Sequence, residues 1–318
     1  MGLTFLDIIE MKIVAIFDGL GNQLFQYALL VALREHYQVP VWMDVSLFET
    51  RRSHNGFELS RIFNITAPTA TKKDLRHLMP IAGHMKLSRY LINMFPNLEW
   101  RYHEEKIVDY YPEVFEINHD VIYQGWWQHY EYFEQYRDIL LQEFTLKQPL
   151  DERNQTLYEE MNANPKAVSV HVRRGDYLKA NYISFLGVCP PDYYRSAVDR
   201  AKQLVGEDAE FYVFSDDLAW CREILPRYIS ADKIRYIDWN RGADSYKDMI
   251  LMSACRTNII ANSTFSWWAA YLNRHADAIT LAPEKWWRNG CAKPIQMPHW
   301  ELIPFEFEAL ESDLETKR

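Results

Sequence analysis

The chain has 318 residues, of which 48% are hydrophobic, 15% aromatic and 25% charged, and its formal net charge is −9. These values are ordinary for a globular protein with a large core, and the length allows two domains. The acidic balance argues against an extended nucleic-acid partner, because binding along a phosphate backbone leaves a basic footprint, whereas a few local cations suffice for a nucleotide.

The N-terminal residues predict neither a signal peptide nor an anchor. Residues 2–10 carry two acidic residues and no basic region, and Met11 precedes a strand-like run, so residues 1–10 are expected to be an extension. No apolar run of about 18 residues occurs, and we expect a cytoplasmic protein with at most peripheral contact at the inner face of a membrane. The widely spaced cysteines favour a reducing compartment; they are Cys189, Cys221, Cys255 and Cys291.

The chain then shows a strand, a glycine-rich turn and a helix. Residues 12–17 are nearly all apolar and predict a buried strand, and residues 24–33 fit a helix. The turn between them, Gly19-Leu20-Gly21-Asn22-Gln23, can present backbone N–H groups to an anion at a helix N-terminus. It lacks the third glycine of a dinucleotide fingerprint and the lysine of a P-loop, so a plain strand-to-helix turn is an equally good interpretation.

The rest of the first half is less regular. The pattern predicts strands at 39–45 and 121–125 and helices at 75–91 and 132–144. A break at Gln148-Pro149-Leu150 indicates a domain boundary. We therefore expect one domain over residues 11–150, a second over 151–300 and an acidic tail over 301–318.

Strand-like and helix-like runs alternate regularly in the second half. Strands are expected at 168–172, 210–214, 233–237, 258–261 and 278–281, and helices at 151–161, 191–204, 218–225, 244–254 and 264–272. This alternation predicts βαβ units and a parallel sheet, with all strands ending at one edge.

Polar side chains follow several of these strands. Arg173 and Arg174 end the first one, and paired guanidiniums suit an anionic ligand because their planar forks can grip phosphate oxygens. Pairing with nearby acids is an equally good interpretation of two adjacent arginines. His171 lies within the strand, so a core histidine is favoured over a general base, while contact with a ligand stays open.

Two further segments at this edge have both structural and functional interpretations. Ser263 and Thr264 open a helix, where one hydroxyl is expected as a cap and the other can face phosphates. Of Asp216 and Asp217, we expect one to cap the next helix and the other to contact a ligand. A metal site is the least favoured interpretation, because no third oxygen ligand is predicted nearby.

Four segments together resemble the bacterial α-1,2-fucosyltransferase family, glycosyltransferase family 11. They are Gly-Leu-Gly-Asn-Gln-x-Phe-Gln-Tyr-Ala at 19–28, His-x-Arg-Arg-Gly-Asp-Tyr at 171–177, Phe-Ser-Asp-Asp at 214–217 and Asn-Ser-Thr-Phe-Ser-Trp-Trp-Ala-Ala-Tyr-Leu at 262–272. They occur in the family's order and cover most of the chain. The chain departs from the family's pattern at Asp18, where another glycine is common, and over residues 125–130.

The resemblance implies an α/β fold of the GT-B type, in which two Rossmann-like domains face a cleft. The N-terminal domain would take the acceptor and the C-terminal domain the donor, GDP-β-L-fucose. The implied reaction moves L-fucose, with inversion, to the O2 hydroxyl of a terminal β-galactoside such as lactose or a surface-glycan repeat unit. No metal or other cofactor is implied. Two alternatives stay open: a fucosyltransferase with another linkage, and a carbohydrate-binding protein without turnover.

The resemblance also implies roles for the matching residues. Arg173 and Arg174 would stabilise the departing diphosphate, and Asp176 is the candidate general base. Its arginine neighbours weaken Asp176 as a base, so orienting Arg173 is its favoured role. The other donor-side residues are His171, Ser215, Asp216, Asp217, Asn262, Ser263, Thr264 and Phe265. On the fucose and acceptor side are Gly21, Asn22, Gln23, Trp126 and Trp127.

Overall fold

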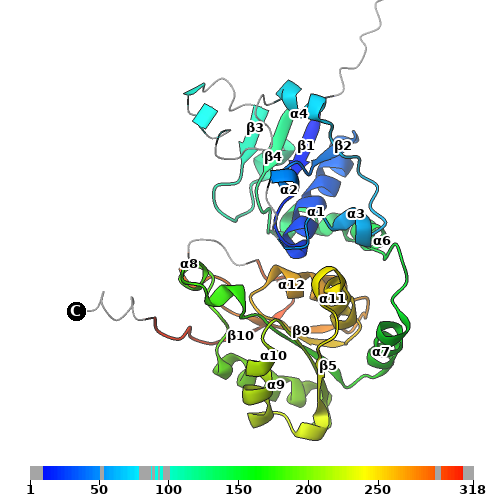
Figure 1. Ribbon diagram of the computed structural model, residues 1–318, viewed down its shortest axis with the longest axis vertical. Helices are drawn as coiled ribbons and strands as arrows, with labels where there is room; N and C mark the ends of the chain where they lie inside the picture. Colours follow the sequence, from blue (N-terminus) through cyan, green and yellow to red (C-terminus); the bar gives the residue numbers. More distant parts are fainter. Residues whose placement is uncertain are drawn as a thin grey trace, which may run out of the picture. The chain divides into compact units, whose positions relative to one another are not determined.

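The computed structural model describes residues 10–50, 54–78, 87, 90–91, 94–95, 101–290 and 295–310. By its internal packing the chain divides into two compact units, Met1–Lys147 and Gln148–Arg318, each with its own parallel sheet (Figure 1). Three expectations lie partly outside the described residues: the extension over 1–10, the helix over 75–91 and the tail over 301–318. The assignment of an acceptor to the first unit and a donor to the second stays a prediction.

The first unit contains a four-stranded sheet in the order β2-β1-β4-β3. Its strands are β1 (Lys12–Ala15), β2 (Val41–Asp44), β3 (Tyr102–Glu104) and β4 (Val121–Gln124). Its helices are α1 (Leu20–Tyr37), α2 (Leu47–Thr50), α3 (Leu59–Ile62), α4 (Lys72–Leu78) and α6 (Arg137–Glu143). Strand β3 was not expected, because three residues are too few to show an alternating pattern.

The helix expected over 132–144 begins later than the sequence indicated. Residues Tyr130–Tyr132 and Glu134–Tyr136 form separate 3₁₀ turns, and the α-helix starts at Arg137. The consecutive residues Tyr132 and Phe133 are both fully buried. Because neighbouring positions on an α-helix point about 100° apart, an irregular backbone buries both rings better than a single amphipathic helix does.

The second unit contains a six-stranded parallel sheet in the order β10-β9-β8-β5-β6-β7. Its strands are β5 (Ala167–Val172), β6 (Glu210–Ser215), β7 (Ile234–Ile237), β8 (Thr257–Ile259), β9 (Ile279–Pro283) and β10 (Glu301–Ile303). Its helices are α7 (Glu152–Ala163), α8 (Ala180–Ile183), α9 (Pro191–Val205), α10 (Leu218–Ile224), α11 (Tyr246–Ser253) and α12 (Thr264–Tyr271).

The central strand β5 is buried along its whole length because helices cover both faces of the sheet. Helices α9 and α10 lie on one face and α11 and α12 on the other (Figure 1). The strand order explains this arrangement: the chain moves outward from β5 to β7 and then returns to β8 on the other side of β5. Right-handed crossovers in opposite directions place their helices on opposite faces.

The segment at 301–303 is part of this sheet and not of a tail. Residues Glu301–Ile303 form β10, which pairs in parallel with β9. Ile303 and Phe305 are buried in the hydrophobic core, whereas Leu302 is exposed. Glu301 within the strand and the acidic residues Glu306 and Glu308 after it hid this short edge strand in the sequence.

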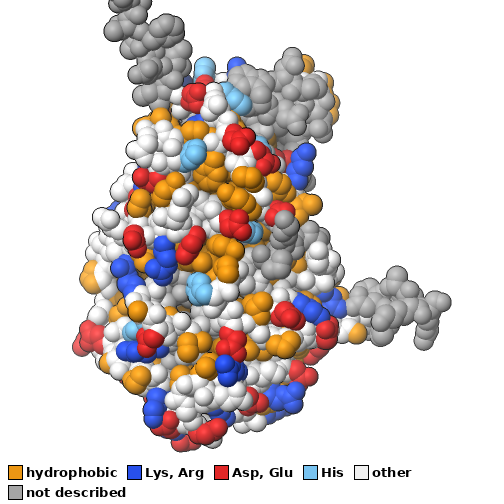
Figure 2. Space-filling model, turned by 180° about the vertical axis from the view of Figure 1, so that it is seen from behind, with side chains coloured by type: hydrophobic (Ala, Val, Ile, Leu, Met, Phe, Trp, Pro, Cys, Tyr) orange, Lys and Arg blue, Asp and Glu red, His pale blue; other side chains and the backbone are white. Residues whose placement is uncertain are grey.

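The described surface shows no large-scale separation of charge in the view of Figure 2, where basic and acidic side chains are interspersed. Within the described residues, no helix has both the length and the apolar character needed to cross a bilayer. Cys189, Cys221 and Cys255 are buried free thiols, and Cys291 lies outside the described residues.

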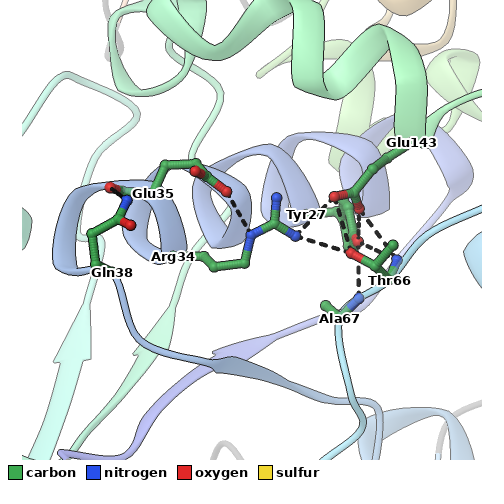
Figure 3. A network of polar contacts seen from close by, with 7 residues as sticks. All are labelled: Tyr27, Arg34, Glu35, Gln38, Thr66, Ala67 and Glu143. Atoms are coloured by element: carbon green, nitrogen blue, oxygen red, sulfur yellow. Dashed lines mark hydrogen bonds and ion pairs between the residues drawn. The ribbon is translucent and has the colours of Figure 1, made fainter.

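A buried polar network ties α1 to α6 in the first unit (Figure 3). Burial raises the pKa of the Tyr27 hydroxyl, which therefore stays protonated and donates to the buried carboxylate of Glu143. The same carboxylate accepts from Arg34 Nη1 at 2.8 Å and from the Thr66 hydroxyl at 3.0 Å. The Tyr27 oxygen in turn accepts from the backbone N–H of Thr66 and of Ala67. One carboxylate on α6 thus satisfies donors from two other segments, α1 and the stretch that contains Thr66.

We expect Glu143→Gln to lower the free energy of unfolding by about 2 kcal/mol, because hydrogen bonds to a buried charged group are lost. Denaturant unfolding measures this value. Glu49→Gln is the control: Glu49 pairs with Lys72, but the two side chains are 60% and 70% exposed, so its loss costs less than about 0.5 kcal/mol. Equal effects of the two substitutions would contradict the structural role of the network.

Candidate functional site

The candidate site in the second unit lies at the carboxyl edge of β8, β5 and β6. These strands are neighbours, and Val172 at the end of β5 is paired with Ser215 at the end of β6. The order of the sheet reverses between β5 and β8, and open α/β sheets bind ligands outside the strand ends at such a reversal. The structure therefore gathers the segments that follow these strands, as the sequence predicted.

Arg173 is held by carboxylates from two different strand ends. Its Nη2 donates to Asp176 Oδ1 at 2.7 Å, within the turn that follows β5. Its Nε lies 3.3 Å from Asp216 Oδ2, after β6, as an ion pair without hydrogen-bond geometry. The guanidinium also lies over the ring of Tyr177 at 5.3 Å.

Arg174 is held in a similar way by the next carboxylate. Its backbone N–H donates to Asp216 Oδ1 at 2.9 Å, and its Nε donates to Asp217 Oδ2 at 3.2 Å. Its guanidinium lies over the indole of Trp220 at 4.4 Å. Asp217 also caps α10 by accepting from the N–H of Trp220, and its own N–H donates to the Ser215 hydroxyl. One aspartate caps the helix, as expected, while Asp216 secures the arginine turn.

The close approach of Asp216 explains the glycine in this turn. A Cβ atom added at Gly175 would lie 2.6 Å from Asp216 Oδ2. This is closer than van der Waals contact allows, so only glycine lets the carboxylate of β6 rest against the turn after β5. The position of both arginines thus depends on the absence of a side chain at 175.

Both arginines pair with acids, which was one of the two interpretations of the sequence. Each guanidinium nevertheless keeps N–H donors that contact no acid. The Nη1 atom of Arg173 and both Nη atoms of Arg174 make no hydrogen bond or ion pair with other described residues. The carboxylates hold each guanidinium from one side. Its remaining donors stay available to an anionic ligand, in a preorganised direction.

His171 is a buried neutral imidazole beside these arginines. Burial, together with the charge of Arg173, lowers the pKa of His171 to about 3. Its Nδ1 atom has no hydrogen-bond partner among the described residues, and its ring packs against Phe265 at 5.7 Å. An unpaired ring nitrogen on a side chain that is 5% exposed needs an external partner, such as a polar ligand atom.

The segment that opens α12 combines structural and accessible groups. The Asn262 side chain is buried and donates to backbone carbonyls, the nearest being Leu186 O at 3.0 Å, so its amide secures the neighbouring loop. Ser263 caps α12 by accepting from the N–H of Phe265. Thr264 and Phe265 are partly exposed at the start of the helix. The accessible part of this segment is therefore its first helical turn.

Some of the residues predicted on the acceptor side are buried and stabilise the fold. Gln23 is fully buried; it donates to the carbonyls of Asp18 and Gly56 and accepts from the N–H of Glu58. Gly21 is buried in the first turn of α1. Asn22 is partly exposed and accepts from Gln128 Nε2 at 2.8 Å, which connects the turn after β1 to the loop after β4.

The two adjacent tryptophans differ in exposure. Trp126 is 39% exposed and Trp127 is fully buried. Their backbone N–H groups both donate to Glu105 Oε2, at 2.6 and 2.9 Å. Glu105, directly after β3, is itself buried, and burial raises its pKa to about 7. The sequence did not single out Glu105, because one acid after an unrecognised strand carries no signal.

Each unit thus has its own group of candidate residues at a strand edge. The second unit brings together His171, Arg173, Arg174, Asp176, Ser215, Asp216, Asp217, Ser263, Thr264 and Phe265, and the first brings together Asn22, Gln23, Trp126 and Trp127. Among the residues described, no group of three or more His, Cys, Asp or Glu side chains is placed to hold a metal ion.

Comparisons with known proteins identify relatives over nearly the whole chain. A family model described as Glycosyl transferase family 11 matches residues 8–303. The O-antigen biosynthesis glycosyltransferase WbnK of Escherichia coli is 31% identical over 301 residues, which are 89% of this chain and 97% of that protein. An alpha-1,2-colitosyltransferase of Escherichia coli is 30% identical over 272 residues, or 84% of this chain and 89% of that protein.

One solved structure supports the fold. The crystal structure of the NodZ alpha-1,6-fucosyltransferase soaked with GDP-fucose aligns with a TM-score of 0.51 at 16% identity, covering 83% of this chain and 93% of that chain. At this identity the likeness concerns the fold alone. Together with the parallel sheets of the two units, it confirms an α/β fold of the GT-B type.

The buried carboxyl of Glu105 predicts a pH-dependent stability. Its folded pKa of about 7 lies above the ordinary 4.5, so the folded protein holds this proton at pH values where the unfolded chain has released it. Stability therefore falls as pH rises from 4.5 to about 7. The total contribution is on the order of 3 kcal/mol.

We expect Glu105→Gln, which does not titrate, to gain stability relative to the wild type across this window. Denaturant unfolding of both proteins at several pH values between 5 and about 8 measures the difference. Stability profiles that stay parallel over this range would show that Glu105 is ionised in the folded protein throughout.

Proposed function

This chain belongs to glycosyl transferase family 11, and on that premise we propose that it transfers L-fucose from GDP-β-L-fucose to the O2 hydroxyl of a terminal β-galactoside. The observation that carries the proposal is the pair of adjacent arginines, preorganised by three carboxylates, with unused donors at the carboxyl edge of a parallel sheet. A protein that only binds a neutral glycan has no use for such a diphosphate grip, which disfavours the non-catalytic alternative.

The proposed reaction is a single in-line displacement, which converts the β-linked donor into an α-linked product. The acceptor oxygen forms a bond to the anomeric carbon, the bond from that carbon to the diphosphate oxygen breaks, and the hydroxyl proton passes to a base. Negative charge develops on the leaving GDP. Arg173 and Arg174 stabilise that charge with N–H donors already fixed in direction, so little reorganisation is needed in the transition state.

The neighbouring groups suit the rest of the nucleotide. The Nδ1 atom of the neutral His171 imidazole can form a hydrogen bond to the guanine or the ribose, because it has no hydrogen-bond partner among the described residues. The first turn of α12 offers backbone N–H groups and the Thr264 hydroxyl to a phosphate, and the helix dipole adds to that attraction. Neither contact needs a metal ion, and we propose that transfer is independent of one.

We propose that Asp176 orients Arg173 and is not the general base. Its Oδ1 accepts the 2.7 Å hydrogen bond from Arg173 Nη2, so this oxygen is occupied in holding the guanidinium. Removing Asp176 would then reduce catalysis through the position of Arg173. A concerted displacement with little help from a base fits the described groups of the second unit.

GDP-colitose is the alternative donor to compare with GDP-fucose, because one relative is an alpha-1,2-colitosyltransferase. Colitose is L-fucose without its 3-hydroxyl. A site that hydrogen-bonds this hydroxyl strongly rejects the deoxy sugar, whereas an apolar pocket discriminates weakly. The ratio of kcat/KM for GDP-fucose and GDP-colitose therefore identifies the physiological donor chemistry.

The function is tested by transfer from GDP-fucose to lactose in the presence of EDTA, with NMR analysis of the product. We expect fucose α-linked to O2 of galactose, and an unchanged rate when EDTA is added. Another linkage would select the alternative transferase. If the protein neither binds GDP nor releases it from GDP-fucose, the donor assignment is wrong.

We expect Arg173→Lys to lower kcat by about 100-fold, because one ammonium group cannot contact both carboxylates and still give a planar pair of donors to the diphosphate. The control is Arg222→Lys. Arg222 also pairs with an aspartate, Asp238 at 3.2 Å, and also lies over a tyrosine ring, but half of its side chain is exposed. Similar kcat values for the two variants would remove Arg173 from the catalytic machinery.

A further inference from the structure

We propose that Asp18 is a positioning residue that fixes the indole of Trp126 as a stacking platform for the galactose ring of the acceptor. This inference rests on the proposed function, which makes a β-galactoside the acceptor. It assigns a role to Asp18 and names the part of the acceptor that is recognised.

The contact between the two residues joins two strand ends of the first unit. Asp18 follows β1 and Trp126 follows β4, and these strands pair in parallel. The indole Nε1 of Trp126 donates to Asp18 Oδ2 at 3.1 Å. The ring also packs against Phe17, with centroids 6.0 Å apart and planes at 69°. The indole is therefore held by its polar edge and by one neighbour, while 39% of the residue remains exposed.

The backbone around this contact is held in conformations that L-residues rarely adopt. Among the described residues, only four non-glycine positions have a positive φ in the left-handed region. Three of them are at this contact. Asp18 (64°) is one partner of the hydrogen bond and Trp127 (53°) follows the other partner, while His54 (50°) lies against the turn after Asp18. A Cβ at Gly19 would lie 3.3 Å from the His54 imidazole. Such strain gathers at ligand sites because surrounding contacts must maintain it.

The buried carboxyl group of Glu105 holds the loop after β4 in place. Its Oε2 accepts from the N–H groups of Trp126 and Trp127, so two hydrogen bonds maintain the left-handed backbone at Trp127. A side chain at Gly125 would overlap Glu105, so this position must be glycine. These contacts bury Trp127 and turn the neighbouring Trp126 outward.

The exposed indole suits one face of a pyranose ring. The C–H groups on the apolar face of galactose pack on an aromatic surface, and nearby polar side chains can bond the hydroxyl groups. Such groups are present beside the platform: His54 is exposed, and Asn22 is partly exposed where it accepts from Gln128. Fixing the indole before binding removes the entropy cost of ordering it later, which is the benefit that Asp18 provides.

The test compares four variants by the dissociation constant of lactose from saturation-transfer NMR and by the KM values for lactose and GDP-fucose. Trp126→Ala removes the platform, and we expect the lactose Kd to rise about tenfold. Asp18→Gly keeps the indole but removes the hydrogen bond that holds it. We expect the lactose Kd to rise about fivefold, with the GDP-fucose KM unchanged. Asp18→Asn keeps an oxygen acceptor and tolerates the left-handed backbone, so its lactose Kd should remain close to that of the wild type.

Gln38→Gly is the matched control. Gln38 has a similar positive φ of 56° and a hydrogen bond from its side chain to Glu35 O, but it caps the opposite end of α1. We expect its lactose Kd to be that of the wild type. Asp18→Gly should not lower the melting temperature, because glycine adopts this left-handed conformation without steric strain, which offsets the greater entropy of its unfolded chain. A purely structural role of Asp18 would instead lower the melting temperature and leave the lactose Kd unchanged.

The outcomes separate this inference from the proposed function. If the protein binds lactose but transfers no fucose to it, the proposed transfer to lactose is wrong. The lactose Kd values of the variants still test the role of Asp18 in that case. An unchanged lactose Kd in Asp18→Gly, or an equal change in Gln38→Gly, overturns the role of Asp18. Absence of lactose binding to the wild type overturns the galactose platform itself, even if the protein transfers fucose to another acceptor.

Discussion

The parallel pairing of β5 with β6 on one side and β8 on the other is the constraint on which the proposed donor site depends. The register places the ends of β5 and β6 side by side, so Asp216 from one strand reaches the turn that follows the other. That contact requires glycine at 175 and fixes both arginines. The opposing neighbour, β8, leads into the first turn of α12. Three distant stretches of sequence thus meet at one edge of the sheet, where we propose that the diphosphate binds.

Much of this edge could be predicted from the sequence, because alternating short strands and helices permit few arrangements. The Val-rich run before Arg173 and the apolar run before Asp216 marked buried strands and therefore a common edge. The partners of each side chain were not predictable, since they depend on register and on loop geometry. Asn262 illustrates this: it stands in a motif beside the site, but its amide secures a neighbouring loop.

The first unit was harder to predict for physical reasons. Strand β3 is too short to show periodicity, so Glu105, which follows it, could not be placed beneath the loop after β4. Trp126 and Trp127 are the same residue type, so the sequence could not show that Trp127 is buried and Trp126 exposed. That difference accompanies a left-handed backbone at Trp127 and the hydrogen bonds from both N–H groups to Glu105. At this edge, buried hydrogen bonds help to decide which side chains are exposed, and the residue types alone do not show it.

We propose that a guanine nucleotide binds at the carboxyl edge of β5, β6 and β8. Amide hydrogen exchange of the full chain, with and without GDP, measures this directly. We expect slower exchange in residues 173–177, 215–218 and 263–266, where backbone N–H groups lie beside the arginines or open a helix. Unchanged exchange in these three segments at saturating GDP, with protection elsewhere, would contradict it.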